Sequence, residues 1–175
     1  MRSRAAVALV ALVALAALAG CGYRLVGTAS NIPPEIRVVR LDSFENRTGR
    51  VQVEQILTSA VADELVTRQR FEVLTTDEGA PDGEITGAVT GFNVRPVSFD
   101  AEGRATEYEI AITVQVVFRQ IAPERVVWQN DRYQFRDSYQ LEASELGYFD
   151  RETPAIEATA RKFAETMVTD LLEGF

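Results

Sequence analysis

The sequence predicts an α+β fold, in which a mainly antiparallel or mixed β-sheet of about four to five strands carries two helices packed on one face. Two segments with helical spacing, 51–70 and 153–173, flank most of the strand-like segments. Segment 106–119 alternates apolar and polar residues almost without interruption. Such alternation is typical of an antiparallel sheet with one buried face and one wet face.

The first 20 residues predict an export signal that is removed. Arg2 and Arg4 precede an uncharged apolar run, 5–19, which is shorter than the about 20 residues needed to span a bilayer. The run ends in "LAGC", residues 18–21, which resembles a bacterial lipobox. That resemblance implies cleavage between Gly20 and Cys21 and acylation of Cys21. The alternative is an ordinary cleaved signal followed by an incidental thiol.

Three segments follow from this interpretation: a lipoprotein signal peptide at 1–20, a lipidated tether at 21–35 and a single α+β domain at 36–175. The tether is rich in Gly, Ser, Asn and Pro, which is linker chemistry. Gly22 follows the cysteine, and by resemblance to lipoprotein sorting signals this favours the outer membrane. The expected location is therefore the periplasmic side of the outer membrane, held by a lipid anchor.

Charge argues against one class of partner. Removal of the two signal arginines leaves 16 of the 18 basic residues against 26 acidic ones, a net charge of −10. Such a chain repels anionic surfaces at long range, so we expect no nucleic-acid partner. Cys21 is the only cysteine, which leaves no internal disulfide.

The first half of the domain predicts a strand–helix–strand unit. Residues 36–44 read as a strand and "ENRTGR", residues 45–50, as a turn. Segment 51–70 is an amphipathic helix whose stripe includes Val53, Leu57, Val61 and Leu65. A short strand at 71–74 and a loop at 75–83 complete the unit.

The second half predicts three long strands and a closing helix. Strict alternation puts Ile85 and Val89 on one face of strand 85–97 and Phe92 and Val94 on the other, so we expect a bulge at Gly91. Strands 106–119 and 125–139 follow, the latter with a bulge near residue 130, and then a loop at 141–151. "TP", residues 153–154, supplies a capping hydroxyl and a first-turn proline for the last helix, which residue 174, a glycine, ends.

The residue types exclude the commonest catalytic sites. The chain has no histidine, and its one thiol is expected to be acylated, which removes Cys–His and Ser–His systems and most zinc sites. Glu107 and Glu109 share a strand face and more carboxylates lie in 77–84, but an acidic protein normally solvates such groups. We expect no catalytic residues, no metal site, no cofactor and no enzymatic activity.

The ordered set of motifs resembles the lipopolysaccharide-assembly lipoproteins, the LptE family. The resemblance rests on "CGYRLVG", "IPPEIRVVRLDSFENRTGR", "EITGAVTGF", "EYEIAITVQVVF", "VVWQNDRYQF" and "LLEGF". It implies a lipoprotein that plugs a large outer-membrane β-barrel (an LptD-like protein), helps the barrel to assemble, and binds lipopolysaccharide on its way to the outer leaflet.

Binding a lipid phosphate needs arginine or lysine donors. Arg119, Arg125, Arg132 and Arg136 lie on neighbouring predicted strands and are the candidate glycolipid-binding residues. The alternative is that they are ordinary surface arginines paired with acidic neighbours such as residues 131 and 137. The net acidity of the chain opposes attraction to an anionic glycolipid.

A second functional class shares the same opening. "VVRLDSFENRTG" followed by an amphipathic helix also resembles periplasmic lipoproteins that act as scaffolds or regulators of cell-wall synthases or secretion assemblies. The long alternating strands and the terminal "LLEGF" favour the lipopolysaccharide-assembly family.

Overall fold

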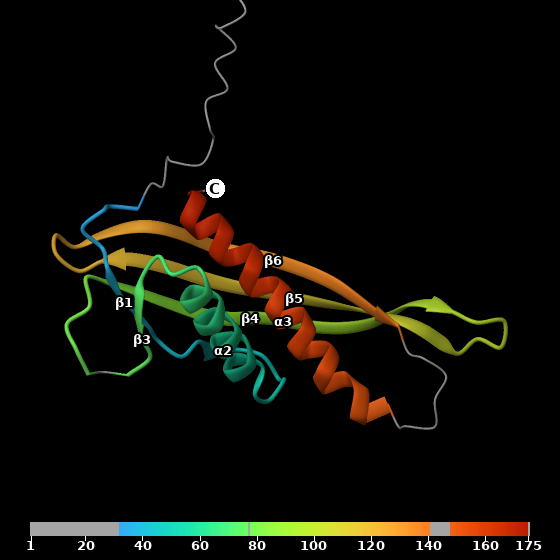
Figure 1. Ribbon diagram of the computed structural model, residues 1–175. Coiled ribbons are helices and arrows are strands. Elements are labelled where there is room, and N and C mark those ends of the chain that lie inside the picture. The colour runs from blue at the N-terminus through green and yellow to red at the C-terminus, as the bar shows by residue number, and fades with distance from the viewer. Residues whose placement is uncertain (1–31, 77, 141–147, 175) are drawn as a thin grey trace, which may run out of the picture.

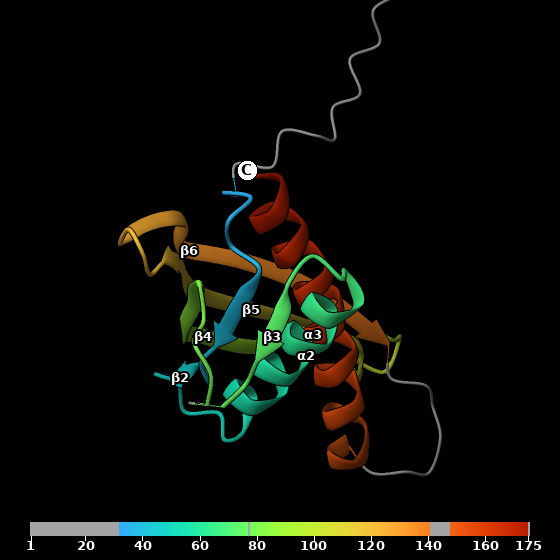
Figure 2. The ribbon, with the colours of Figure 1, turned by 60° about the vertical axis from the view of Figure 1, so that its left-hand side comes forward.

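A mixed β-sheet forms one layer and two helices form the other in the computed structural model, which describes residues 32–76, 78–140 and 148–174 (Figure 1). The elements in chain order are β1 (Val38–Leu41), β2 (Glu45–Asn46), α2 (Val53–Thr67), β3 (Glu72–Leu74), β4 (Gly83–Phe99), β5 (Ala105–Gln120), β6 (Arg125–Gln140) and α3 (Tyr148–Glu173). Both helices cover the same face of the sheet (Figures 1 and 2). The predicted α+β class is confirmed.

The sheet joins a parallel part to an antiparallel part. Its strand order is β3-β1-β4-β5-β6, with β1 parallel to both of its neighbours and β4, β5 and β6 forming an antiparallel meander. A short sixth strand, β2, pairs with β4 inside the segment predicted to be only a turn. Buried Phe44 and the bond from the Arg47 N–H to the Val89 carbonyl, 2.9 Å, keep this segment alongside β4.

Helix α2 connects two parallel strands, β1 and β3, and buries the predicted stripe. Val53, Leu57, Val61 and Leu65 are all at most 1% exposed. The helix starts two residues later than predicted because Gln52 has a left-handed backbone, with φ 68°, which is incompatible with helix at that residue. Burial of this stripe against the sheet provides most of the reason for the helix to form.

The long strands confirm the predicted alternation and both predicted bulges. Register shifts occur between Val89 and Gly91 in β4 and between Val114 and Val116 of β5, opposite residues 130–133 of β6. The first bulge returns Phe92 and Val94 to the face that holds Ile85 and Val89, since all four pair with inward residues of β5. One apolar face therefore runs along the whole meander.

Helix α3 begins earlier than the sequence indicates. The prediction placed its start at Thr153 and Pro154, but the helix begins at Tyr148 and Pro154 lies inside it. Pro154 is thus the seventh residue of the helix, past the first turn, where it cannot donate one helical hydrogen bond, and its presence does not identify the first helical residue. The rest of the predicted loop, 141–147, lies outside the described residues. At the other end Gly174, with φ 79°, donates to the Asp170 carbonyl at 2.8 Å, which confirms the predicted end.

One hydrophobic core lies between the layers. Phe163 of α3 is fully buried and makes edge-on contacts with Tyr133 and Phe135 of β6. The other buried residues of α3 are Ile156, Thr159, Ala160, Ala164, Met167, Val168 and Leu171. The core begins at Ile32, which is 4% exposed although it belongs to the predicted tether. Cys21 and the predicted cleavage site lie outside the described residues.

Candidate binding face of the sheet

The face of β4, β5 and β6 that points away from both helices is called the open face here. In β5, Ile110, Ile112, Val114, Val116 and Phe118 are at most 1% exposed and point toward the helices. The alternate residues, among them Glu107, Glu109, Thr113, Gln115 and Arg119, lie on the open face as predicted. Among the described residues, no helix covers this face (Figures 1 and 2).

A row of charged residues crosses three strands of the open face. Arg40 of β1 pairs in register with Glu84 of β4, and Glu84 pairs with Arg119 of β5. The Arg40 guanidinium binds the Glu84 carboxylate and also Asp42, at 3.0 Å. The hydrogen bond to Glu84 is the main cause that raises the pKa of Arg40, while partial burial opposes it. Arg40 is therefore compensated, and Arg119 lies at the end of the row.

The two strand carboxylates that could have suggested catalysis both have protein partners. Arg95 of β4 donates to Glu109 at 2.9 Å, and the hydroxyl of Ser138 in β6 donates to Glu107 at 2.7 Å. Within the described part of the chain, no group of three or more His, Cys, Asp or Glu side chains could hold a metal ion. These contacts make the carboxylates part of a hydrogen-bonded surface.

The four candidate arginines lie along the β5–β6 pair rather than in one compact cluster. Arg119 pairs with Val126, and Arg125 pairs with Gln120. Arg136 pairs with Ala111, eight residues along β5 from Arg119, which corresponds to about 26 Å at about 3.3 Å per residue. The structure therefore separates two arginines beside the β5–β6 turn from the rest.

Arg132 and Arg136 lie nearer the middle and far part of β6. Val114 pairs with Tyr133 and Val116 with Asn130, so residues 131 and 132 together lie opposite Gln115 at the bulge. Both arginines are exposed, and neither makes an ion pair with another described residue. They are thus available cationic groups on an otherwise acidic chain.

Asp137 does not pair with these arginines. Its carboxylate points to α3 and accepts two hydrogen bonds from the Lys162 ammonium, at 2.7 and 2.9 Å. On the same side, the Tyr133 hydroxyl donates to Asp170 of α3 at 2.6 Å. Sequence reasoning missed both links because they join residues 25 and 37 positions apart, and alternation alone does not show which helix residue faces which strand residue.

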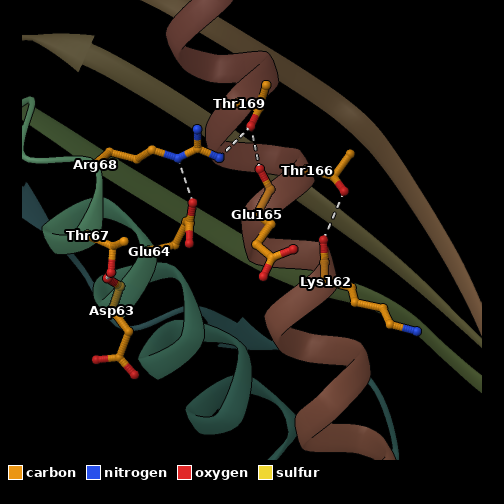
Figure 3. A network of polar contacts seen from close by, with 8 residues as sticks. All are labelled: Asp63, Glu64, Thr67, Arg68, Lys162, Glu165, Thr166 and Thr169. Atoms are coloured by element: carbon orange, nitrogen blue, oxygen red, sulfur yellow. Dashed lines mark hydrogen bonds and ion pairs between the residues drawn. The ribbon is translucent and has the colours of Figure 1, made fainter.

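A polar network ties the two helices together on the outer side of the helix layer (Figure 3). Arg68, at the end of α2, binds Glu64 at 2.6 Å and donates to the Thr169 hydroxyl of α3 at 2.8 Å. Thr166 and Thr169 donate to carbonyls one turn earlier in α3. The Arg68–Thr169 hydrogen bond links the two helices, whereas the other bonds of the network lie within one helix.

The sequence of the chain matches the model of a known protein family. The protein-family model described as "LptE: Lipopolysaccharide-assembly" matches residues 36–171. No curated protein matches the chain. In the described residues, no helix is both long and apolar enough to cross a membrane.

Several solved structures share the fold at low sequence identity. The PelC dodecamer from Paraburkholderia phytofirmans is 14% identical, with a TM-score of 0.54 over 81% of this chain and 92% of that chain. Protein XCC0632 from Xanthomonas campestris is 12% identical, with a TM-score of 0.51 over 81% and 88%. CT253 from Chlamydia trachomatis is 9% identical, with a TM-score of 0.52 over 79% and 97%.

These likenesses concern the fold. The family match is of another kind, because it is a match to the sequence and extends from just before β1 to the last turn of α3. This protein belongs to the LptE family of lipopolysaccharide-assembly proteins.

Proposed function

We propose that this protein is a non-enzymatic outer-membrane lipoprotein that plugs a large, LptD-like β-barrel, helps it to assemble, and assists lipopolysaccharide transport to the outer leaflet. An acylated Cys21 holds it on the periplasmic side of the membrane. The observation that carries the proposal is the family match across 36–171. The two-sided polar surface described above supports it.

A plug has to present polar groups around its circumference, because the lumen of a large membrane barrel is polar. The open face supplies glutamines, arginines and one serine, Ser138, from β5 and β6, and the helix layer supplies the network of Figure 3. The apolar residues are concentrated between the layers. The domain thus fits a water-filled lumen on both of its faces.

Glycolipid contact is assigned to the open face. Arg132 and Arg136 are exposed and have no carboxylate partner among the described residues, whereas Arg40 and Arg95 are compensated. Guanidinium groups bind phosphate with two parallel hydrogen bonds. A local pair of free arginines offsets the repulsion that the net charge of the chain would otherwise exert on an anionic headgroup.

The absence of histidine supports a role without catalysis. The buried ionisable contact between Tyr133 and Asp170 joins β6 to α3, and burial followed by this hydrogen bond raises the pKa of Tyr133. A phenol held neutral in this way has a structural role. Turnover of a substrate by the purified protein would contradict this part of the proposal.

The plug is tested by the partner that copurifies. The full-length protein, with a C-terminal affinity tag, is extracted in mild detergent and its partners are identified by mass spectrometry. We expect one large outer-membrane barrel in about equal amount. Recovery of a cell-wall synthase or a secretion component instead would favour the alternative scaffold function.

Glycolipid binding is tested by reversing charge on the open face. The double variant Arg132→Glu/Arg136→Glu should lose lipopolysaccharide binding and keep the barrel complex. The matched control is Arg104→Glu/Arg161→Glu, which makes the same change in net charge on the hairpin turn and on α3. Equal loss in both variants, or no loss in the first, would contradict specific binding by these arginines.

A further inference from the structure

The β5–β6 turn lies at the end of the sheet where the described chain begins. The N–H of Ile121 donates to the Asp82 carbonyl at 2.8 Å. The Asp82 carboxylate in turn accepts hydrogen bonds from the N–H groups of Arg37 and Val38, both at 2.9 Å. Asp82 therefore links the turn to the start of β1, and the C-terminal end of α3 lies at the same end (Figures 1 and 2).

The distance to the proposed anchor limits how far this end of the sheet can lie from the membrane. Ile32 follows Cys21 by eleven residues, which can span at most about 40 Å when fully extended. Strand β4 alone has 17 residues, about 56 Å at about 3.3 Å per residue. An acylated Cys21 consequently keeps the start of the described chain, which lies at the same end as the β5–β6 turn, within about 40 Å of the bilayer, while the β4–β5 turn lies at the opposite end (Figure 1).

The surface at this end combines apolar and cationic side chains. Ile121 is 44% exposed and Val126 is 48% exposed, and they are two of six exposed large apolar residues in the described part of the chain. Arg119 pairs with Val126 in register, and Arg125 follows the turn. Apolar side chains flanked by arginines are typical of proteins that lie on a membrane interface. The residues Arg119, Ile121, Arg125 and Val126 are called the turn surface below.

Hydrogen bonds of the Gln120 side chain stabilise the conformation of the turn surface. Gln120 is only 6% exposed, and its amide donates to the Ala122 carbonyl at 3.0 Å. Its amide oxygen accepts a 2.8 Å hydrogen bond from the Arg125 guanidinium. Neither Arg119 nor Arg125 makes an ion pair with another described residue. Segment 119–126 carries two arginines against one glutamate, whereas the whole chain has a net charge of −8.

We propose that the turn surface rests on the phospholipid headgroups of the membrane that anchors the protein. Ile121 and Val126 reach the boundary between headgroups and acyl chains, and Arg119 and Arg125 bind headgroup phosphates. The inference rests on the proposed acylation of Cys21. It divides the four candidate arginines into a pair beside the β5–β6 turn that binds the anchoring membrane and a pair further along β6 that binds the transported glycolipid.

The test compares two exposed alanines in the two turns of the meander. Because acylation would block the sulfur of Cys21, Ala122→Cys or Ala101→Cys gives the full-length acylated protein a single free thiol, to which a nitroxide is attached. Each protein is reconstituted in vesicles of phosphatidylethanolamine and phosphatidylglycerol that lack lipopolysaccharide. We expect the label at position 122 to be accessible to oxygen and shielded from a water-soluble relaxation agent, and the label at position 101 to be fully accessible to that agent.

A second pair of variants tests the apolar contact itself. In the Ala122→Cys background, Ile121→Glu/Val126→Glu should raise the water accessibility of the label to the level found at position 101. The control is Val51→Glu/Val66→Glu, which changes two other exposed valines, 78% and 60% exposed, and should leave the label shielded. Circular dichroism confirms that each variant is folded.

Three results would overturn the inference. A label at position 122 that is as accessible to water as the one at position 101, on protein shown by mass spectrometry to be acylated, would refute the membrane contact alone. Shielding that appears only when a barrel copurifies would assign the turn surface to a protein partner. An unmodified thiol at Cys21 would refute both this contact and the proposed anchoring.

Discussion

The Tyr133 hydroxyl donates a 2.6 Å hydrogen bond to Oδ2 of Asp170, and this bond joins the edge strand β6 to the closing helix α3. Tyr133 is 8% exposed and also contacts Phe163, at a ring-centroid distance of 5.8 Å. Burial and the hydrogen bond both favour the neutral phenol, so the pKa of Tyr133 is raised. Tyr133 thus joins the sheet to the helix layer through both a hydrogen bond and an aromatic contact.

Tyr133→Phe should lower the free energy of unfolding by about 1.5 kcal/mol near neutral pH, because the hydrogen bond that the Tyr133 hydroxyl donates to the Asp170 carboxylate is lost. A raised phenol pKa contributes stability that is present below the unfolded value, about 10, and is lost as pH rises above it. The wild type should therefore lose stability faster than the variant above about pH 10. Urea denaturation across this range measures the difference, and Asp170→Asn, which keeps an acceptor, should have the smaller effect at neutral pH.

Asp82 fixes the start of β1 through the N–H groups of Val38 and Arg37. These hydrogen bonds lower the pKa of its carboxyl, and partial burial opposes them. A lowered pKa contributes stability above the unfolded value and loses it as pH falls through the folded value. Asp82→Asn should therefore be less stable than wild type near pH 7 and should approach it near pH 3. Glu124→Gln, an exposed change in the neighbouring turn, should show no such dependence in denaturation experiments.

Gly83 lets β4, β5 and β1 approach closely at the end of the sheet that carries the β5–β6 turn. A Cβ there would lie 2.9 Å from the Arg119 carbonyl oxygen and 3.3 Å from Ile36. Gly83→Ala should cost about 1–3 kcal/mol, because the backbone carbonyl cannot move aside as a side chain could. Gly49→Ala is the matched control, since nothing lies within 4 Å of its Cβ. Equal thermal stability of the two variants would show that the strands can separate without cost.

Phe163 should be the most sensitive single position of α3. It is fully buried against Tyr133 and Phe135 of β6, so Phe163→Ala leaves a cavity and should cost about 3–5 kcal/mol. Glu165→Ala, two residues further on the exposed side of the helix, should change stability by less than about 0.5 kcal/mol. Chemical denaturation of both variants checks the ratio, and similar losses would mean that α3 does not pack on the sheet through Phe163.

Much of the fold follows from periodicity in the sequence. The alternation of Ile110, Ile112, Val114, Val116 and Phe118 predicts the buried face of β5, because strand side chains alternate with a period of two. Phase breaks near Gly91 and residue 130 predict the two bulges for the same reason. The start of α3 was not predictable in this way, since a proline signal identifies only a region where a helix can begin.

The candidate site, too, could be predicted only in part from the sequence. The residue types alone excluded catalytic sites that need histidine. They also identified four potential hydrogen-bond donors to phosphate, Arg119, Arg125, Arg132 and Arg136. Which of these arginines are free depends on the pairing of β1 with β4, which compensates Arg40, and on the packing of α3, which turns Asp137 toward Lys162. Such long-range contacts have no periodic signature in the chain.

The sequence by itself determined the family, the layer architecture and the two faces of the meander, because each of these follows from local periodicity and from the order of the motifs. Only the tertiary structure decided that the β5–β6 turn lies beside the start of the chain and that two of the arginines are grouped with exposed Ile121 and Val126 there. The physical reason is that distance in space is set by strand pairing and core packing, which join residues many positions apart.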